Sequence, residues 1–206
     1  MKVKAVVFDY GGVLTSVSMP IRVREAVEAR GLPWAAVEDG FARWRGEYDR
    51  GTLSLSGFYD RIWSAAGCDV APEVRREIEE ADNASWLYRN ERTLAWMREL
   101  RAGGFRLGIL TNMPATYAPV FRGHFADFVA EAEALVISGE VGTVKPDPAI
   151  YAIMRGRLGL EPGEICFVDD NAKNVEGARA CGWRAIRFES NAQVEREFAA
   201  LAEAED

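Results

Sequence analysis

Several features are scarce in this chain of 206 residues, and each scarcity excludes a class of protein. A single histidine, His124, rules out any chemistry that needs two histidines. Lys and Arg, 25 in all, are outnumbered by 32 Asp and Glu, which gives a formal net charge of −7. Nucleic acid and anionic membranes both require a basic face on the protein, so we expect neither as a partner.

Long apolar runs and paired cysteines are also missing. No run approaches the roughly 20 apolar residues that span a bilayer, and the start MKVKAVVFDY turns acidic too soon for a signal peptide. The three cysteines are odd in number and lack the spacing of metal ligands. They indicate a reducing compartment, and we expect a cytoplasmic protein.

Five short apolar segments predict a parallel sheet. They are VKAVVF (3–8), FRLGIL (105–110), ALVIS (134–138), ICFV (165–168) and RAIRF (184–188). Each is apolar on both faces, as a strand buried between two layers of helices must be. The last four alternate with helical stretches, which predicts an α/β fold with a doubly wound, Rossmann-like sheet of about five strands.

The segment between the first two predicted strands is too long for a simple crossover, which needs only about a dozen residues. Its pattern is helical throughout, with helices expected near residues 20–30, 34–49, 55–66 and 71–82. We interpret residues 16–89 as an inserted all-helical cap domain and residues 1–15 and 90–206 as the core. The cap leaves from the carboxyl end of the first strand, where open α/β sheets bind ligands.

Aromatic and basic residues are concentrated in the expected cap. We expect its tryptophans to build its hydrophobic core, as aromatic side chains in small domains usually do; they are Trp44, Trp63 and Trp86. Some members of a second group could instead face the cleft and contact substrate hydroxyls or a second anion; the group comprises Arg43, Arg45, Tyr48 and Arg89.

Polar residues follow four of the predicted strands. They are Asp9 after the first, Thr111 and Asn112 after the second, Lys145 after the third, and Asp169 and Asp170 after the fourth. Taken singly, each has a structural explanation, because Asp before Gly-Gly forms turns and Thr, Asn and Asp cap helices. In a parallel sheet, however, all of them converge on one edge, which makes a shared function the better explanation.

The chemistry that this set fits is phosphoryl transfer through a covalent aspartyl-phosphate. Asp9 is the candidate nucleophile, and Asp9 and Asp170 offer carboxylates for one Mg²⁺. Lys145 supplies a second positive charge, while the Thr111 hydroxyl and nearby backbone N–H groups suit phosphate oxygens.

The sequence resembles the haloacid dehalogenase superfamily over essentially its whole length. FDYGGVLT, LGILTN, VGTVKPDPAIY and FVDDNAKNVEGARACGW resemble the four motifs of that superfamily. DRGTLSLSGFYDRIW and NERTLAWMRELRAGGFRLGILTNM are similar to the branch with helical caps that contains the phosphatase domain of soluble epoxide hydrolase and bacterial sugar-phosphate phosphatases.

This resemblance implies a role for each matching residue. Asp9 would be the nucleophile and Lys145 the charge stabiliser, with Thr111 and Asn112 contacting phosphate and substrate. Mg²⁺ would be held by Asp9, Asp170 and the backbone carbonyl of residue 11. Asp169 would be an auxiliary ligand, and Asn174 would position Lys145 or a metal-bound water.

Gly11 departs from the family pattern, because most phosphatases of this superfamily carry Asp there to protonate the leaving group. General acid–base help is worth about 10²–10⁴-fold, so its loss need not abolish turnover. We therefore expect a selective Mg²⁺-dependent phosphatase of a small-molecule phosphate monoester, such as a sugar phosphate, acting as a monomer or homodimer.

Two alternatives stay open. The first is a 2-haloacid dehalogenase, whose branch needs no metal and carries an uncharged residue in place of the Asp169–Asp170 pair. The second is a catalytically weak phosphate-binding or regulatory protein, which Gly11 favours and the retained Asp9, Lys145 and Asp170 disfavour.

Overall fold

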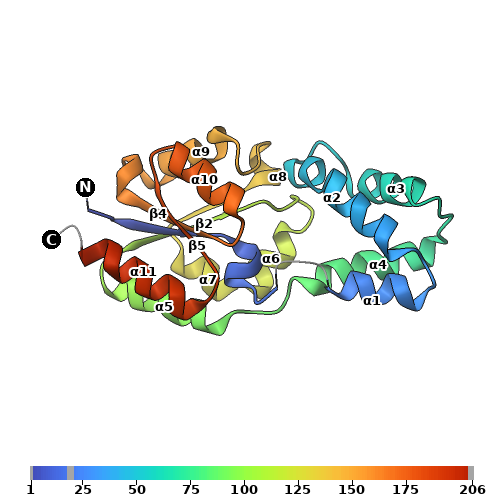
Figure 1. The fold of residues 1–206 in the computed structure, drawn as a ribbon, viewed down its shortest axis with the longest axis horizontal. Coiled ribbons are helices and arrows are strands. Elements are labelled where there is room, and N and C mark those ends of the chain that lie inside the picture. Colours follow the sequence, from blue (N-terminus) through green and yellow to red (C-terminus); the bar gives the residue numbers. More distant parts are fainter. Residues whose placement is uncertain (1, 18–20, 204–206) are drawn as a thin grey trace.

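A five-stranded parallel sheet forms the centre of the computed structural model, which describes residues 2–17 and 21–203 (Figure 1). The strand order is β3-β2-β1-β4-β5. The strands are β1 (Ala5–Phe8), β2 (Arg106–Thr111), β3 (Ala134–Ile137), β4 (Ile165–Asp169) and β5 (Arg184–Arg187). The predicted doubly wound α/β sheet is therefore confirmed. Phe8 is in register with Ile109 and Val168, so β1 ends between its two neighbours.

Helices cover both faces of this sheet because its strands are apolar on both sides. One face packs against α5 (Glu91–Ala102), α6 (Ala118–His124), α7 (Ala126–Glu131) and α11 (Asn191–Glu203). The other packs against α9 (Pro148–Leu158) and α10 (Ala172–Ala180). Side chains alternate along β1, since Phe8 lies in the first of these cores and Val7 in the second. Short turns complete the core at η1 (Tyr10–Leu14), α8 (Ser138–Val141) and η2 (Pro162–Glu164).

Four helices form a separate helical unit beyond the carboxyl end of β1 (Figure 1). They are α1 (Ile21–Ala29), α2 (Trp34–Arg50), α3 (Leu55–Ala65) and α4 (Pro72–Ser85). This unit has its own hydrophobic core, in which Trp63 is 1% exposed and against which Trp44 packs. The prediction for Trp86 is wrong, because its side chain packs instead against the core beneath the sheet. Trp86 directly follows α4, where the chain returns to the sheet.

The end of α2 docks on the loops at the carboxyl edge of the sheet. The Ser138 hydroxyl donates to the backbone carbonyl of Asp49 at 2.6 Å and accepts from the Met113 N–H at 2.8 Å. A Cβ on Gly139 would lie 2.3 Å from the Ala115 nitrogen, so only glycine fits there. The predicted third strand accordingly ends one residue early, because Ser138 leaves the sheet to make this junction.

The described residues contain no helix that is both long and apolar enough to cross a membrane.

Candidate active site

The carboxyl edge of the sheet brings the predicted polar residues to one place. Asp9 follows β1 directly. Asp169 is the last residue of β4, and Asp170 is the next residue in the chain. Lys145 arrives from the loop between α8 and α9. Thr111 ends β2 but is 1% exposed and does not line the cavity described below. The structure thus joins the acidic residues and the lysine, whereas the Thr111 side chain is buried outside the cavity lining.

Lys145 is the cation at the centre of this arrangement. Its Nζ lies 2.7 Å from Oδ1 of Asp9 and 2.7 Å from Oδ2 of Asp169, and it donates to the Leu110 carbonyl at 3.0 Å. Burial opposes the charge on the lysine, but the carboxylates of Asp169 and Asp9 outweigh burial and raise the pKa of Lys145. The side chain is therefore a fixed ammonium that uses all three of its donors.

Two asparagines hold this network in place. Asn112 binds the backbone of Lys145 twice, donating from Nδ2 to the carbonyl at 3.0 Å and accepting from the N–H at 2.7 Å. Asn174 donates from Nδ2 to both oxygens of Asp169 at 3.1 Å. Asn174 therefore positions Lys145 indirectly, through Asp169. Asn112 lines the cavity, but both the nitrogen and the oxygen of its amide are hydrogen-bonded to the backbone of Lys145.

The acidic residues outnumber the cation. One carboxylate oxygen from each of Asp9, Asp169 and Asp170 lies within 4.8 Å of the other two. Burial and the charge of Asp169 raise the pKa of Asp9 well above its ordinary value, although Lys145 works in the opposite direction. The same two causes raise the pKa of Asp170. One lysine thus leaves these carboxylates with uncompensated negative charge.

The donor set fits a divalent cation. Both oxygens of Asp169 are already taken, by Lys145, Asn174 and the Asn171 N–H. Asp9 and Asp170 both line the cavity, as does Gly11. Carboxylate and carbonyl oxygens are the ligands that Mg²⁺ prefers, and a divalent cation offsets the repulsion between the two aspartates.

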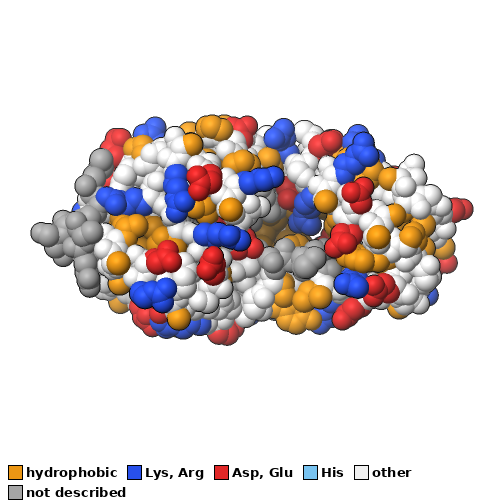
Figure 2. Space-filling view, in the orientation of Figure 1, with side chains coloured by type: hydrophobic (Ala, Val, Ile, Leu, Met, Phe, Trp, Pro, Cys, Tyr) orange, Lys and Arg blue, Asp and Glu red, His pale blue; other side chains and the backbone are white. Residues whose placement is uncertain are grey.

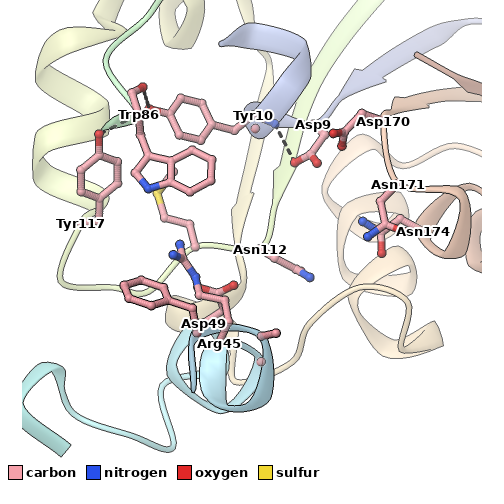
Figure 3. Close-up of a pocket in the computed structure, with 15 residues that line it drawn as sticks. Asp9, Tyr10, Arg45, Asp49, Trp86, Asn112, Tyr117, Asp170, Asn171 and Asn174 are labelled. Atoms are coloured by element: carbon pink, nitrogen blue, oxygen red, sulfur yellow. Dashed lines mark hydrogen bonds and ion pairs between the residues drawn. The ribbon is translucent and has the colours of Figure 1, made fainter. Parts of the chain in front are cut away.

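A cavity of about 410 Å³ lies between this acidic edge and helix α2 (Figure 3). Its size is in the range of small-molecule sites, roughly 300–1,000 Å³. The lining residues from α2 are Phe41, Ala42, Arg45, Gly46 and Asp49. Aromatic side chains of Tyr10, Trp86 and Tyr117 form another wall.

Arg45 and Asp49 form an ion pair in the wall that faces the acidic edge (Figure 3). Arg45 Nε lies 2.7 Å from Asp49 Oδ1, and the guanidinium carbon lies 5.4 Å from the centre of the Trp86 ring. Trp86 in turn donates from Nε1 to Asp82 at 3.0 Å. Burial disfavours the charge on Arg45, but Asp49 and Asp82 outweigh it and raise the pKa of the arginine.

Four cap residues were candidates for facing the cleft, and of these Arg45 alone lines this cavity. Arg43 lies over the Trp44 ring, and Tyr48 is buried with its hydroxyl 2.9 Å from Thr116 Oγ1. Arg89 forms ion pairs with Asp127 and Glu91. Sequence reasoning missed Asp49 and the aromatic wall. The spacing of residues 41, 45 and 49 was the available signal, because positions four apart share one face of a helix.

The presence of glycine at position 11 is explained by a neighbouring side chain and not by the backbone conformation. Its φ of −63° and ψ of 129° are open to any residue. A Cβ at this position would lie 3.3 Å from Cζ3 of Trp86, which is a tight contact. The Trp86 ring therefore packs where a longer side chain at position 11 would begin.

The sequence profile of the haloacid dehalogenase-like hydrolases matches residues 3–182. The chain therefore belongs to this family, which confirms the resemblance and the expectation of a hydrolase. Two relatives show the range of the family. The phosphoserine phosphatase of Thermus thermophilus is 32% identical, over 77% of this chain and 68% of its own. The (S)-2-haloacid dehalogenase 1 of a Pseudomonas species is 30% identical, over 90% of this chain and 84% of its own.

Solved structures share the fold. A haloacid dehalogenase family enzyme from Bacteroides thetaiotaomicron, crystallised with magnesium and inorganic phosphate, superposes with a TM-score of 0.71 at 22% identity. The alignment covers 90% of this chain and 93% of that enzyme. At this level of identity the likeness establishes the architecture, including the placement of helices around the sheet.

Proposed function

We propose that this hydrolase is a Mg²⁺-dependent phosphatase that cleaves a small-molecule phosphate monoester through an aspartyl-phosphate on Asp9. The observation that carries the proposal is the charge imbalance at the sheet edge. Three clustered carboxylates share a single lysine, and two of them have raised pKa values from burial and from Asp169. Such a site is suited to a divalent cation and a bound anion together. The related enzyme crystallised with magnesium and phosphate supports this assignment.

In the proposed reaction, an Asp9 oxygen attacks phosphorus as the bond from phosphorus to the ester oxygen breaks, and the leaving group departs with that electron pair as an anion, which solvent protonates where its basicity requires. Water then attacks the phosphorus of the aspartyl-phosphate, releasing phosphate and regenerating the Asp9 carboxylate. Lys145, fixed 2.7 Å from Asp9, keeps a positive charge beside the developing negative charge throughout. Mg²⁺ held by Asp9, Asp170 and the Gly11 carbonyl would offset repulsion between the carboxylate and the phosphate. The backbone N–H groups at the strand ends are the proposed phosphate contacts, because the Thr111 side chain is 1% exposed and does not line the cavity.

The absence of a carboxylate at position 11 restricts the substrate. Without a general acid the enzyme forgoes about 10²–10⁴-fold in rate for poor leaving groups. Glycosyl, acyl and aryl phosphates need little protonation and lose least. We further propose that residues 16–89 act as the cap over this site and that residues 1–15 and 90–206 form the core. A cavity of about 410 Å³ suits a small metabolite.

Dehalogenation is the competing reaction, because a relative of 30% identity is a 2-haloacid dehalogenase. Both reactions form an ester on an aspartate, so Asp9 alone does not separate them. The Asp169–Asp170 pair favours the phosphatase, since additional negative charge near Asp9 calls for a metal. A regulatory phosphate-binding protein, in contrast, has no need of a nucleophile beside a buried lysine.

The test is hydrolysis of acetyl phosphate, p-nitrophenyl phosphate and a panel of sugar phosphates with Mg²⁺, with excess EDTA, and with Asp9→Asn. We expect turnover that EDTA abolishes and that Asp9→Asn lowers by roughly 10³-fold or more, because the amide is a poor nucleophile. Halide release from 2-chloropropionate is the parallel assay. Halide release that survives EDTA, or phosphate release unchanged in Asp9→Asn, would refute the proposal.

A further inference from the structure

The side of the cavity facing the acidic edge has a charge pattern that limits what the substrate can carry. Phosphoryl transfer is in line, so the leaving oxygen points away from Asp9 and toward α2. Arg45 is the cation on that wall, and it lies beside Asp49 at 2.7 Å. The carboxylate of Asp82 is close enough to raise the pKa of Arg45 as well. The wall that receives the leaving group is therefore not net positive.

The hydrogen-bonding capacity of this wall suits hydroxyl groups. Arg45 uses Nε on Asp49, and its two terminal nitrogens have no hydrogen-bond partner among the residues that the structure describes. Asp49 presents acceptor oxygens directly beside those donors. A hydroxyl both donates and accepts, so it can use the arginine and the aspartate together. A carboxylate only accepts hydrogen bonds. If it accepted from the Arg45 donors, its negative charge would be repelled by the carboxylate of Asp49 beside them.

The rest of the cavity gives no compensation for a second anion. At the acidic edge across from α2, the negative charges of three carboxylates would be balanced by Lys145 and a divalent cation. The transferred phosphate then adds negative charge that no further cation of this edge offsets. The remaining wall is aromatic, from Tyr10, Trp86 and Tyr117, and covers C–H surface without adding charge. Asp49 itself is 6% exposed, so water screens its charge only weakly.

We propose that the substrate of this site has a neutral, polyhydroxylated leaving group, whose hydroxyls bind the Arg45–Asp49 pair, and that Asp49 makes the enzyme reject carboxylated leaving groups. This inference rests on the proposed phosphatase activity and names its substrate class. It also separates this chain from its dehalogenase relative, whose 2-haloacid substrate carries a carboxylate. Asp49 is the residue that determines the selectivity, because it cancels the charge of Arg45.

A matched pair of esters tests this inference. α-D-Glucose 1-phosphate and α-D-glucuronic acid 1-phosphate differ only at C6, where a hydroxymethyl group becomes a carboxylate. We expect kcat/KM to favour the glucose ester by about tenfold or more, the ratio that corresponds to roughly 1.4 kcal/mol. Asp49→Asn should move the ratio at least fivefold toward the glucuronic acid ester, because Arg45 is then uncompensated. Glu47→Gln is the matched control, since it removes the same charge from an exposed position of the same helix.

A second variant should change the ratio of the two kcat/KM values in the opposite direction. It keeps the inference testable if Asp49→Asn does not fold. Arg45→Gln leaves Asp49 without its cation and should widen the preference for the glucose ester. If neither ester is hydrolysed, their inhibition constants against acetyl phosphate hydrolysis give the same comparison. A wild-type preference for the carboxylated ester, or ratios unchanged in both variants, would overturn the inference. Absence of acetyl phosphate hydrolysis would instead refute the phosphatase activity itself.

Discussion

Two buried ionic clusters face each other across the cavity, and they are balanced differently. At the sheet edge, Lys145 serves Asp9 and Asp169, and Asp170 adds a third carboxylate nearby. In the helical unit, Arg45 pairs with Asp49, while Asp82 is satisfied by neutral donors, Trp86 Nε1 and the Tyr59 hydroxyl.

The difference teaches which cluster needs a ligand. Burial and Asp169 raise the pKa values of Asp9 and Asp170, so the sheet edge holds more negative charge than its own residues stabilise. Burial raises the pKa of Asp49 as well, although Arg45 works in the opposite direction, so the helical unit differs in pairing one carboxylate with a cation and placing the other, Asp82, on neutral donors. We therefore propose a site for a metal and an anion on the side of the sheet edge, and a wall for hydroxyl groups on the side of the helical unit.

Of the substitutions that test this comparison, replacement of Lys145 is expected to have the largest effect on stability and activity. Lys145→Met leaves Asp9 and Asp169 as buried carboxylates without their cation, and loss of one partner of a buried pair costs about 3–5 kcal/mol. We expect that loss in the free energy of unfolding measured with urea, together with loss of phosphatase activity. Lys4→Met removes a lysine that is 57% exposed from its pair with Glu164 and should cost less than about 1 kcal/mol. Equal losses in the two variants would contradict the central role of Lys145.

Asp170→Asn sharpens the comparison through its pH dependence. A raised pKa means that the ionised carboxylate is unfavourable in the folded state, mainly because of burial and Asp169. That cost is absent below the pKa of the unfolded chain and fully present above the raised pKa of the folded state. Without Mg²⁺, Asp170→Asn should therefore raise Tm at neutral pH, by roughly 2 °C because solvent screens a partly open site.

The gain in Tm should disappear as the pH falls through the raised pKa of Asp170, and the variant should no longer be stabilised by Mg²⁺. Differential scanning calorimetry at several pH values, with and without Mg²⁺, measures both effects. Glu99→Gln is the control, because Arg92 lowers the pKa of that exposed carboxyl and the sign of its effect is opposite. A Tm gain for Asp170→Asn that grows in acid would contradict the assignment.

The smallest effect is expected at the boundary between the two clusters. Gly11→Ala places a Cβ 3.3 Å from Trp86 Cζ3, so the ring must move by a few tenths of an ångström. The backbone angles accept alanine, and we expect a change in stability below about 1 kcal/mol. A shift in tryptophan fluorescence should accompany it. Gly123→Ala, whose Cβ has no neighbour within 4 Å, should leave the emission unchanged.

The core of this fold was predictable from sequence because its rules are local. Apolar segments of five or so residues, each followed by a polar residue, specify parallel strands and place Asp9 and Asp169 on one edge. The helical unit was recognisable from its length and pattern. Which of its side chains form its own core could not be predicted, because Trp63 and Trp86 look alike in sequence and pack in different cores. The Arg45–Asp49 pair is local, because the two residues lie four apart on α2, but its position across the cavity from Asp9 depends on how α2 docks.

The junction at Ser138 couples recognition to access. Its hydroxyl holds the carbonyl of Asp49, the residue whose carboxylate faces the leaving group. A movement of α2 away from this junction would break this bond and carry the Arg45–Asp49 pair away from the acidic edge. Under the proposed function, a leaving group that forms hydrogen bonds with this pair would favour the docked position of α2, whereas one that repels the pair would favour its own release before phosphoryl transfer.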